Sequence, residues 1–330
     1  PLRMAGYSFP SYVTRTSKAL LAFILVEYVI MCGLSVGAIV TTDDSSDASD
    51  DALGQVSKFA ALVALTLTGA LAFAVDGILT ENAFEILAFI AMNLLYGSYI
   101  LYNYARDRHD STTVSPVTLI PSTIRLIASC ILVPINTFLG YRVYSELGWR
   151  QFSVVGASRP LTKAYAQYQQ TLALTKLDVQ ASWSLVIALY LFVVQNPGLD
   201  VGLTIGDWTS VVVASAGLFA LRTGIRTEHK LPVYMAGLVL VAHLAYVAGR
   251  FAAAILHPTL HDNTHSPDAS RWVPFVVGLA SVTAFVRLWL LVMMTICTRN
   301  FGLGLLSVYQ RSKERQDDTA DDLPTERSGL

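Results

Sequence analysis

Apolar residues fill most of the chain in long blocks, which short polar segments separate. A helix rises 1.5 Å per residue, so about 20 apolar residues cross the roughly 30 Å hydrocarbon layer of a bilayer. Eight blocks are candidates for such a crossing. They are Lys18–Val40, Phe59–Ile78, Ala83–Tyr104, Val117–Tyr141, Ser182–Val194, Leu203–Leu221, Leu231–Leu256 and Trp272–Thr298. The pattern therefore predicts an all-α fold, a polytopic transmembrane bundle of eight helices.

The longest interval between two blocks, residues 141–181, follows the fourth block. From Leu161 onward, apolar side chains recur at helical spacing through Tyr165, Tyr168 and Leu172. This spacing predicts an amphipathic helix at the inner membrane interface, before the fifth span. The alternative is one helix that runs on into the fifth span, because Ser182–Val194 alone is short for a crossing.

This interval divides the chain into two halves of four spans each. We predict a first half at residues 1–140, a cytoplasmic linker helix at 141–181, a second half at 182–308 and a disordered cytoplasmic tail at 309–330. A parallel four-plus-four repeat is suggested by two spans that run in the same direction. In them, Arg125-Leu126 and Arg287-Leu288 each precede an asparagine and a glycine.

Lysine and arginine are distributed unequally between the two sets of connecting segments. With both termini on the cytoplasmic side, the inner segments carry 16 of these residues and the outer segments carry 5. Such an excess is typical of cytoplasmic loops. The acidic run at residues 43–51 then lies outside, away from the anionic inner leaflet. We therefore predict that both termini are cytoplasmic. The identity of the membrane does not follow from the sequence.

The composition agrees with a chain that is solvated by lipid. Hydrophobic residues make up 53% of it and charged residues only 14%, against about 25% in soluble domains. The net charge of −1 gives no basic field that would attract nucleic acid. The predicted partners are the lipid bilayer and a small solute or ion, and an oligomeric state does not follow from the sequence.

Residues 144–178 carry a pattern of aromatic residues followed by Lys-Leu-Asp. The pattern comprises Tyr144-Ser-Glu-Leu-Gly-Trp149, Tyr165-Ala-Gln-Tyr168-Gln169, Leu172, Leu174 and Lys176-Leu-Asp178. Over these residues the chain resembles an uncharacterised family of multi-pass membrane proteins of fungi and protists. The resemblance implies a polytopic helical fold and no established activity, so it carries no functional residue over.

Ionisable residues inside the spans are the candidate functional residues. Each costs about 2.5–3.5 kcal/mol at a helix centre and normally faces the bundle interior. Glu27 and Arg287 lie at similar depths, roughly 13 and 16 Å from the inner face. We expect these two residues to form an ion pair or to share a polar cavity. Towards the outer side lie Arg125, Asp207 and Arg250, with Asp207 as a candidate counter-ion for Arg250.

These buried charges support two functional hypotheses. In the first, they line the path of a small-solute or ion transporter or of a channel-like protein. In the second, they are structural ion pairs in a non-transporting scaffold or receptor-like protein. A water-accessible cavity at Glu27 and Arg287 favours the first, and a dry, tightly packed bundle favours the second.

The remaining motifs predict no chemistry. His257, His261 and His265 are spaced four apart, but prolines beside them indicate an exposed loop, so we predict no metal site. Gly33 and Gly37 form a Gly-x-x-x-Gly pair that we assign to packing inside the bundle rather than to dimerisation. No catalytic triad or phosphate-binding loop occurs, and neither catalysis nor a cofactor is predicted.

Overall fold

A computed structural model describes the protein at residues 13–43, 50–109, 116–155, 158–194, 201–256 and 267–303. These residues form eight long helices. They are α1 (Arg15–Asp43), α2 (Asp50–Leu79), α3 (Ala83–His109), α4 (Pro116–Val155), α5 (Arg159–Val194), α6 (Val201–Arg226), α7 (Lys230–Leu256) and α9 (Pro267–Arg299). Each is long and apolar enough to cross a membrane. The prediction of an all-α bundle with eight spans is confirmed.

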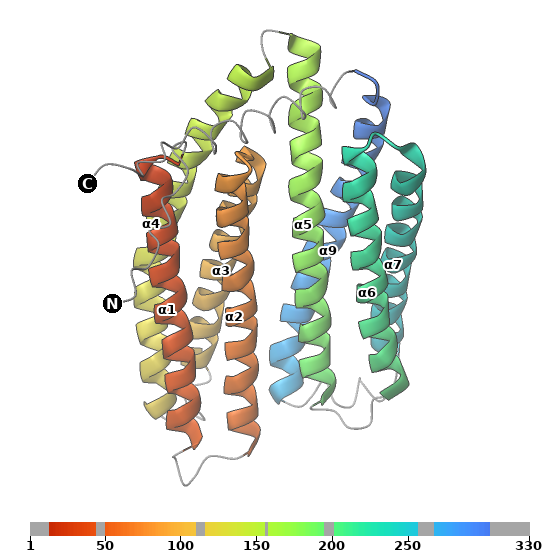
Figure 1. Ribbon diagram of the computed structural model, residues 1–330. Helices are drawn as coiled ribbons and strands as arrows, with labels where there is room; N and C mark the ends of the chain where they lie inside the picture. The colour runs from red at the N-terminus through yellow and green to blue at the C-terminus, as the bar shows by residue number, and fades with distance from the viewer. Residues whose placement is uncertain are drawn as a thin grey trace, which may run out of the picture.

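The helices pack as two neighbouring groups of four. In the first group, α1 packs on α2 and α4, and α3 packs on α2 and α4. In the second group, α5 packs on α6 and α9, and α7 packs on α6 and α9. Successive helices alternate in direction, so the start of α1 and the end of α9 lie at the same end of the bundle, the upper end in Figure 1.

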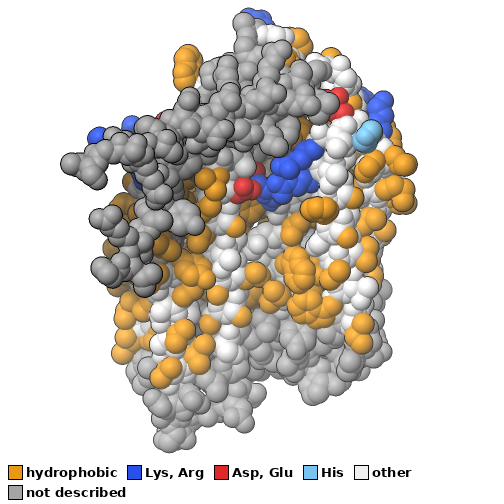
Figure 2. Space-filling view, viewed as in Figure 1, with side chains coloured by type: hydrophobic (Ala, Val, Ile, Leu, Met, Phe, Trp, Pro, Cys, Tyr) orange, Lys and Arg blue, Asp and Glu red, His pale blue; other side chains and the backbone are white. Residues whose placement is uncertain are grey.

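Apolar side chains cover the outside of the bundle where its spans are described. Phe219, Leu231 and Leu238 are each about two-thirds exposed or more, at 72%, 73% and 66%. Figure 2 shows hydrophobic side chains spread along the described face, with the charged groups gathered toward its upper end. A water-soluble protein would bury such residues, whereas a lipid-facing surface exposes them. The exposure pattern agrees with an integral multi-pass membrane protein.

The amphipathic helix that precedes the fifth span belongs to α5. This helix runs without a break from Arg159 to Val194, so the alternative of a continuous helix is the one observed. Five consecutive residues, Thr171–Thr175, are buried. A helix packed on one side only would bury every third or fourth residue. The run of five shows that α5 is covered on all sides at this level, because it packs on α2, α3 and α4 of the first group as well as on its own neighbours α6 and α9 (Figure 1).

Two matching turns connect α2 to α3 and α6 to α7. Their sequences are Gly77-Ile-Leu-Thr-Glu81 and Gly224-Ile-Arg-Thr-Glu228. Both glutamates have a φ of 53°, in the left-handed region that non-glycine residues seldom occupy. In each turn the residue after the glutamate donates its backbone N–H to the carbonyl of the glycine, at 2.9 Å. The two groups thus share a turn of the same geometry, with four of its five residues identical, at the same place in the helix order.

The glycines of these turns permit close contact between neighbouring helices. A Cβ atom added at Gly224 would lie 2.9 Å from Val233 Cγ2 and 3.0 Å from Pro232 Cβ. The first-group counterpart, Gly77, faces Ile86 at the same 2.9 Å. In contrast, an added Cβ would meet no atom within 4 Å at Gly33 or at Gly37. The prediction that these two glycines pack inside the bundle is therefore wrong, because they lie on an exposed side of α1.

Replacing Gly224 by alanine is expected to destabilise the protein by about 1–3 kcal/mol, because the added methyl group overlaps Val233 and Pro232. Gly33→Ala is the matched control, and we expect it to be neutral or mildly stabilising, since alanine is the better helix former. Thermal unfolding in detergent measures both effects. Equal shifts for the two variants would contradict the contact geometry.

Candidate functional site

The most deeply buried ion pair of the described residues joins α5 to α9. Arg287 donates from Nε to both oxygens of Asp178, at 3.0 and 3.2 Å, and from Nη2 to Oδ2 at 2.8 Å. The side chains of Arg287 and Asp178 are 1% and 0% exposed. Charges that are removed from water in this way are stable only when they are paired and hydrogen-bonded. The pair thus fixes α9 against the middle of α5.

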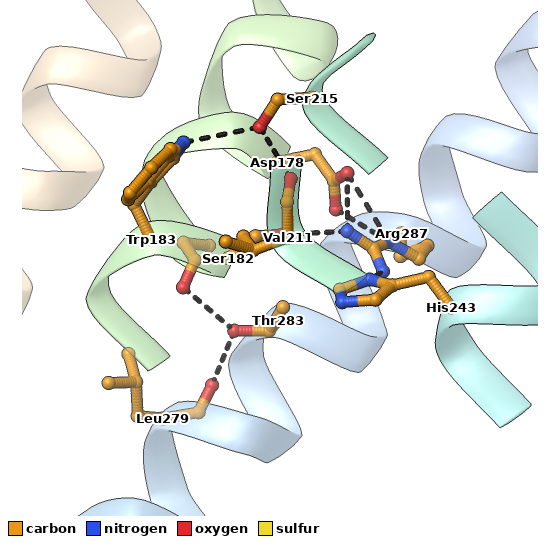
Figure 3. Close-up of polar contacts among 10 residues, drawn as sticks. Asp178, Ser182, Trp183, Val211, Ser215, His243, Leu279, Thr283 and Arg287 are labelled. Carbon is orange, nitrogen blue, oxygen red and sulfur yellow. Dashed lines mark hydrogen bonds and ion pairs between the residues drawn. The ribbon is translucent and has the colours of Figure 1, made fainter. Parts of the chain in front are cut away.

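Two further side chains contact the guanidinium group of Arg287. Nη2 also donates to Ser182 Oγ at 2.6 Å, one helical turn after Asp178 on α5. Nη1 contacts Nδ1 of His243, a buried residue of α7 (Figure 3). An arginine can only donate hydrogen bonds, so Nδ1 must accept, and the neutral ring carries its proton on Nε2. We call Asp178, Ser182, His243 and Arg287 the α5–α7–α9 centre.

A small cavity adjoins this centre on the side of α6. Its volume is about 10 Å³, which is room for about one water molecule. Its polar lining comes from Ser182, Asp207, Ser210, His243 and Tyr246. The Tyr246 hydroxyl donates to Asp207 Oδ1 at 2.9 Å. His243 Nε2 is buried and makes no hydrogen bond within the described structure. The cavity can therefore hold a water that accepts from this nitrogen.

The opposite face of α5 carries a second charged cluster. Lys176 Nζ donates to Glu85 Oε1 of α3 at 2.6 Å and also contacts Asp76 of α2. Glu85 is 2% exposed, and Asn82 donates to the same oxygen at 3.0 Å. Residues two apart on a helix point about 200° apart. Lys176 therefore binds the first group of helices, while Asp178 binds the second.

Glu27 lies in the first group and has a different partner from the predicted one. Its Oε2 accepts from Asn136 Nδ2 of α4 at 2.5 Å, and the side chain is 1% exposed. Arg287 is held by Asp178 in the other group of helices. The predicted ion pair between Glu27 and Arg287 is therefore wrong, and neither residue lines the cavity beside Ser182 and His243. Their depths are similar, but α1 packs on α2 and α4, whereas α9 packs on α5 and α7.

The other predicted site residues lie in different places. Arg125 is buried on α4 and donates to the carbonyl of Leu34 on α1 at 3.2 Å. Leu34 is seven residues, or roughly 10 Å, outward from Glu27. Arg125 binds a backbone carbonyl of α1, whereas Arg287 binds the carboxylate of Asp178, so the two arginines do not mark a repeat. Asp207 lines the cavity, whereas the side chain of Arg250 lies outside the described residues, so its pairing with Asp207 stays a prediction.

Two other expectations fall on parts of the chain that the structure does not describe. The histidine loop at 257–265 lies outside the described residues, as does the tail at 309–330.

The sequence pattern missed several residues that matter most. The apolar pattern places Asp178 and Lys176 in a cytoplasmic linker, although they lie in the Lys-Leu-Asp motif that carries the family resemblance. The signal that would have identified them is the short fifth block, which becomes long enough to span a membrane only if it begins near Leu172. His243 is a lone histidine in an apolar block, and periodicity gives it no particular weight.

A comparison with protein families matches one part of the chain. The family model described as "Domain of unknown function (DUF7789)" matches residues 8–141. The match includes α1, α2, α3 and most of α4, and with them Glu27 and Asn136. The family resemblance noted at residues 144–178 lies beyond this match. No curated protein and no solved structure matches the chain.

Proposed function

We propose that this integral membrane protein is a proton-linked transporter of a small solute, with the α5–α7–α9 centre as its working site. The observation that carries the proposal is the contact between Arg287 and His243 Nδ1 inside the membrane-spanning region. Ionisable groups at this depth are costly and mark ion or substrate paths in many membrane proteins.

The contact between Arg287 and His243 couples a proton to a change in packing. Nδ1 accepts from the guanidinium only while it is unprotonated. A proton on Nδ1 would set two donors and two positive charges against each other, so the contact would break. His243 would then turn towards Asp207, which lines the same cavity, and Arg287 would keep Asp178. Binding of a proton thus favours a second arrangement of α7 against α9.

The arrangement of the helices is compatible with alternating access. Two groups of four helices meet along α5, and transporters with parallel repeats move one such group against the other. Lys176 holds the first group and Asp178 the second, so α5 connects them at one level. The excess of lysine and arginine on one set of connecting segments supports cytoplasmic termini.

The alternative is a non-transporting scaffold in which the same contacts are purely structural. The small size of the cavity, about 10 Å³, favours it, since the described conformation has no room for a solute there. In the transport hypothesis, this conformation is a closed state of the cycle. The two hypotheses differ in whether reconstituted protein moves solute and protons.

Vesicles that contain the purified protein and a trapped pH dye provide the test. Amino acids, sugars, carboxylates and nucleosides are added in separate groups outside. We expect at least one group to acidify the lumen. We expect His243→Asn to abolish that acidification, because its amide oxygen accepts from Arg287 but binds no proton. Ser215→Ala is the control, since Ser215 accepts from Trp183 outside the centre. If the vesicles respond like protein-free ones to every group, the scaffold hypothesis is correct.

A further inference from the structure

The two groups of helices carry buried polar residues at corresponding positions. The buried stripe of α1 includes Ser17, Leu20, Ile24, Glu27 and Met31, and that of α5 includes Tyr168, Thr171, Thr175, Asp178 and Ser182. The steps between these residues are identical in the two helices, and the single acid of each stripe is its fourth member. Glu27 therefore corresponds to Asp178.

The third and fourth helices of each group extend this correspondence. Tyr96 follows Glu81 of the first matching turn by 15 residues, and His243 follows Glu228 of the second turn by 15 residues. Both are buried. On the fourth helices, Asn136 donates to Glu27 as Arg287 donates to Asp178. Each group thus places one acid, one ring with a polar atom and one donor side chain around its centre.

The two centres differ in charge. In the second group, Arg287 supplies the positive charge that a buried carboxylate needs. In the first group, Asn136 is neutral and cannot supply it. On α4, Arg125 lies about two turns outward at Leu34, and on α2 no charged residue occurs between Lys58 and Asp76. Tyr28 and Cys32 are the neighbouring titratable groups on α1, and Tyr96 is the one on α3.

Three buried polar atoms near Glu27 make no hydrogen bond within the described structure. They are Glu27 Oε1, Asn136 Oδ1 and the Tyr96 hydroxyl. Tyr96 belongs to the same buried apolar cluster as Met31, one turn from Glu27, and Val133, one turn from Asn136. If Glu27 is ionised, Oε1 and Oδ1 are both acceptors. A proton on Oε1 converts it into a donor, and acceptors are then available for it.

We infer that Glu27, Asn136 and Tyr96 form a proton-binding site in the first group of helices, where a bound proton replaces the guanidinium of the second group. The proton is carried by Glu27 Oε1, while Oε2 accepts from Asn136. Three oxygens are too few for a hard metal ion, which takes about six or more ligands. The site is separate from the α5–α7–α9 centre, and its occupancy does not depend on transport.

Infrared difference spectroscopy of the purified full chain in lipid tests this inference directly. We expect a carboxylic-acid C=O band that shifts in D₂O, disappears as the pH is raised, and is absent in Glu27→Gln. Glutamine keeps the acceptor for Asn136, so this variant should fold and melt as the wild type does. Asn136→Arg supplies a fixed cation and should remove the band while Glu27 is retained.

Three results would contradict the proton-binding site. A band that persists unchanged in Glu27→Gln belongs to another acid and refutes the site. A band that is assigned to Glu27 but resists every pH at which the chain stays folded shows a permanent structural acid instead. Loss of the band on adding NaCl at constant pH shows a sodium site. If the band titrates but the vesicles transport nothing, the proton site stands and the proposed transport function fails.

Discussion

Asp178→Asn is expected to destabilise the protein by about 3–5 kcal/mol, the usual effect of breaking a buried ion pair. The substitution keeps the shape of the side chain and removes only its charge. Arg287, which is 1% exposed, would then have no anion to balance its charge in the described structure. Thermal or denaturant unfolding in detergent measures the effect.

A double variant distinguishes the effect of losing the ion pair from the cost of leaving one unpaired charge buried. Replacing Asp178 by leucine and Arg287 by methionine removes both charges, and such swaps are often neutral or stabilising by about 1–4 kcal/mol. We therefore expect the double variant to recover most of the stability that Asp178→Asn loses. A double variant that is less stable than the single one would show that Ser182 and His243 need the arginine for their own packing.

Lys176→Met is expected to have the second largest effect, a destabilisation of about 2 kcal/mol. Glu85 is buried and would lose its cation, which is costly. The loss is smaller than at Asp178, because the side chain of Asp76 is 41% exposed and water screens it. Since Lys176 connects α5 to α2 and α3, we also expect faster proteolysis between the two groups of helices.

Lys163→Met is the matched control for this prediction, since Lys163 is an exposed lysine on the same helix. We expect it to change the unfolding free energy by less than about 0.5 kcal/mol. If Lys163→Met and Lys176→Met destabilise the protein equally, the network with Glu85 has no special role. Restoration of stability by adding Glu85→Gln to Lys176→Met would support the network.

The length of the apolar blocks was sufficient to predict the number and order of the helices, because lipid imposes one length on every span. The same rule misplaced the start of the fifth helix. The part of this helix that precedes Ser182 carries Thr171, Thr175 and Asp178, which are polar yet buried. They are shielded by other helices rather than by lipid, and hydropathy does not separate these two environments.

The pairing of the buried charges could not be predicted from depth alone. Glu27 and Arg287 have opposite charges at similar depth, but they belong to different groups of helices. Which helices touch depends on side-chain packing across the bundle, for example on the close contact of Gly69 with Gln180. The matching turns at Gly77 and Gly224 were a readable signal of the repeat, stronger than the pair Arg125 and Arg287 that suggested it.

Solute-driven acidification by vesicles that contain the Asp178→Leu, Arg287→Met double variant tests most directly whether the α5–α7–α9 centre transports. The account predicts a folded protein that keeps most of the wild-type stability but no longer responds to the solute group that drives acidification by the wild type. An equally stable double variant that acidifies the lumen at the wild-type rate would contradict it, because the buried pair would then serve only to hold α9 against α5.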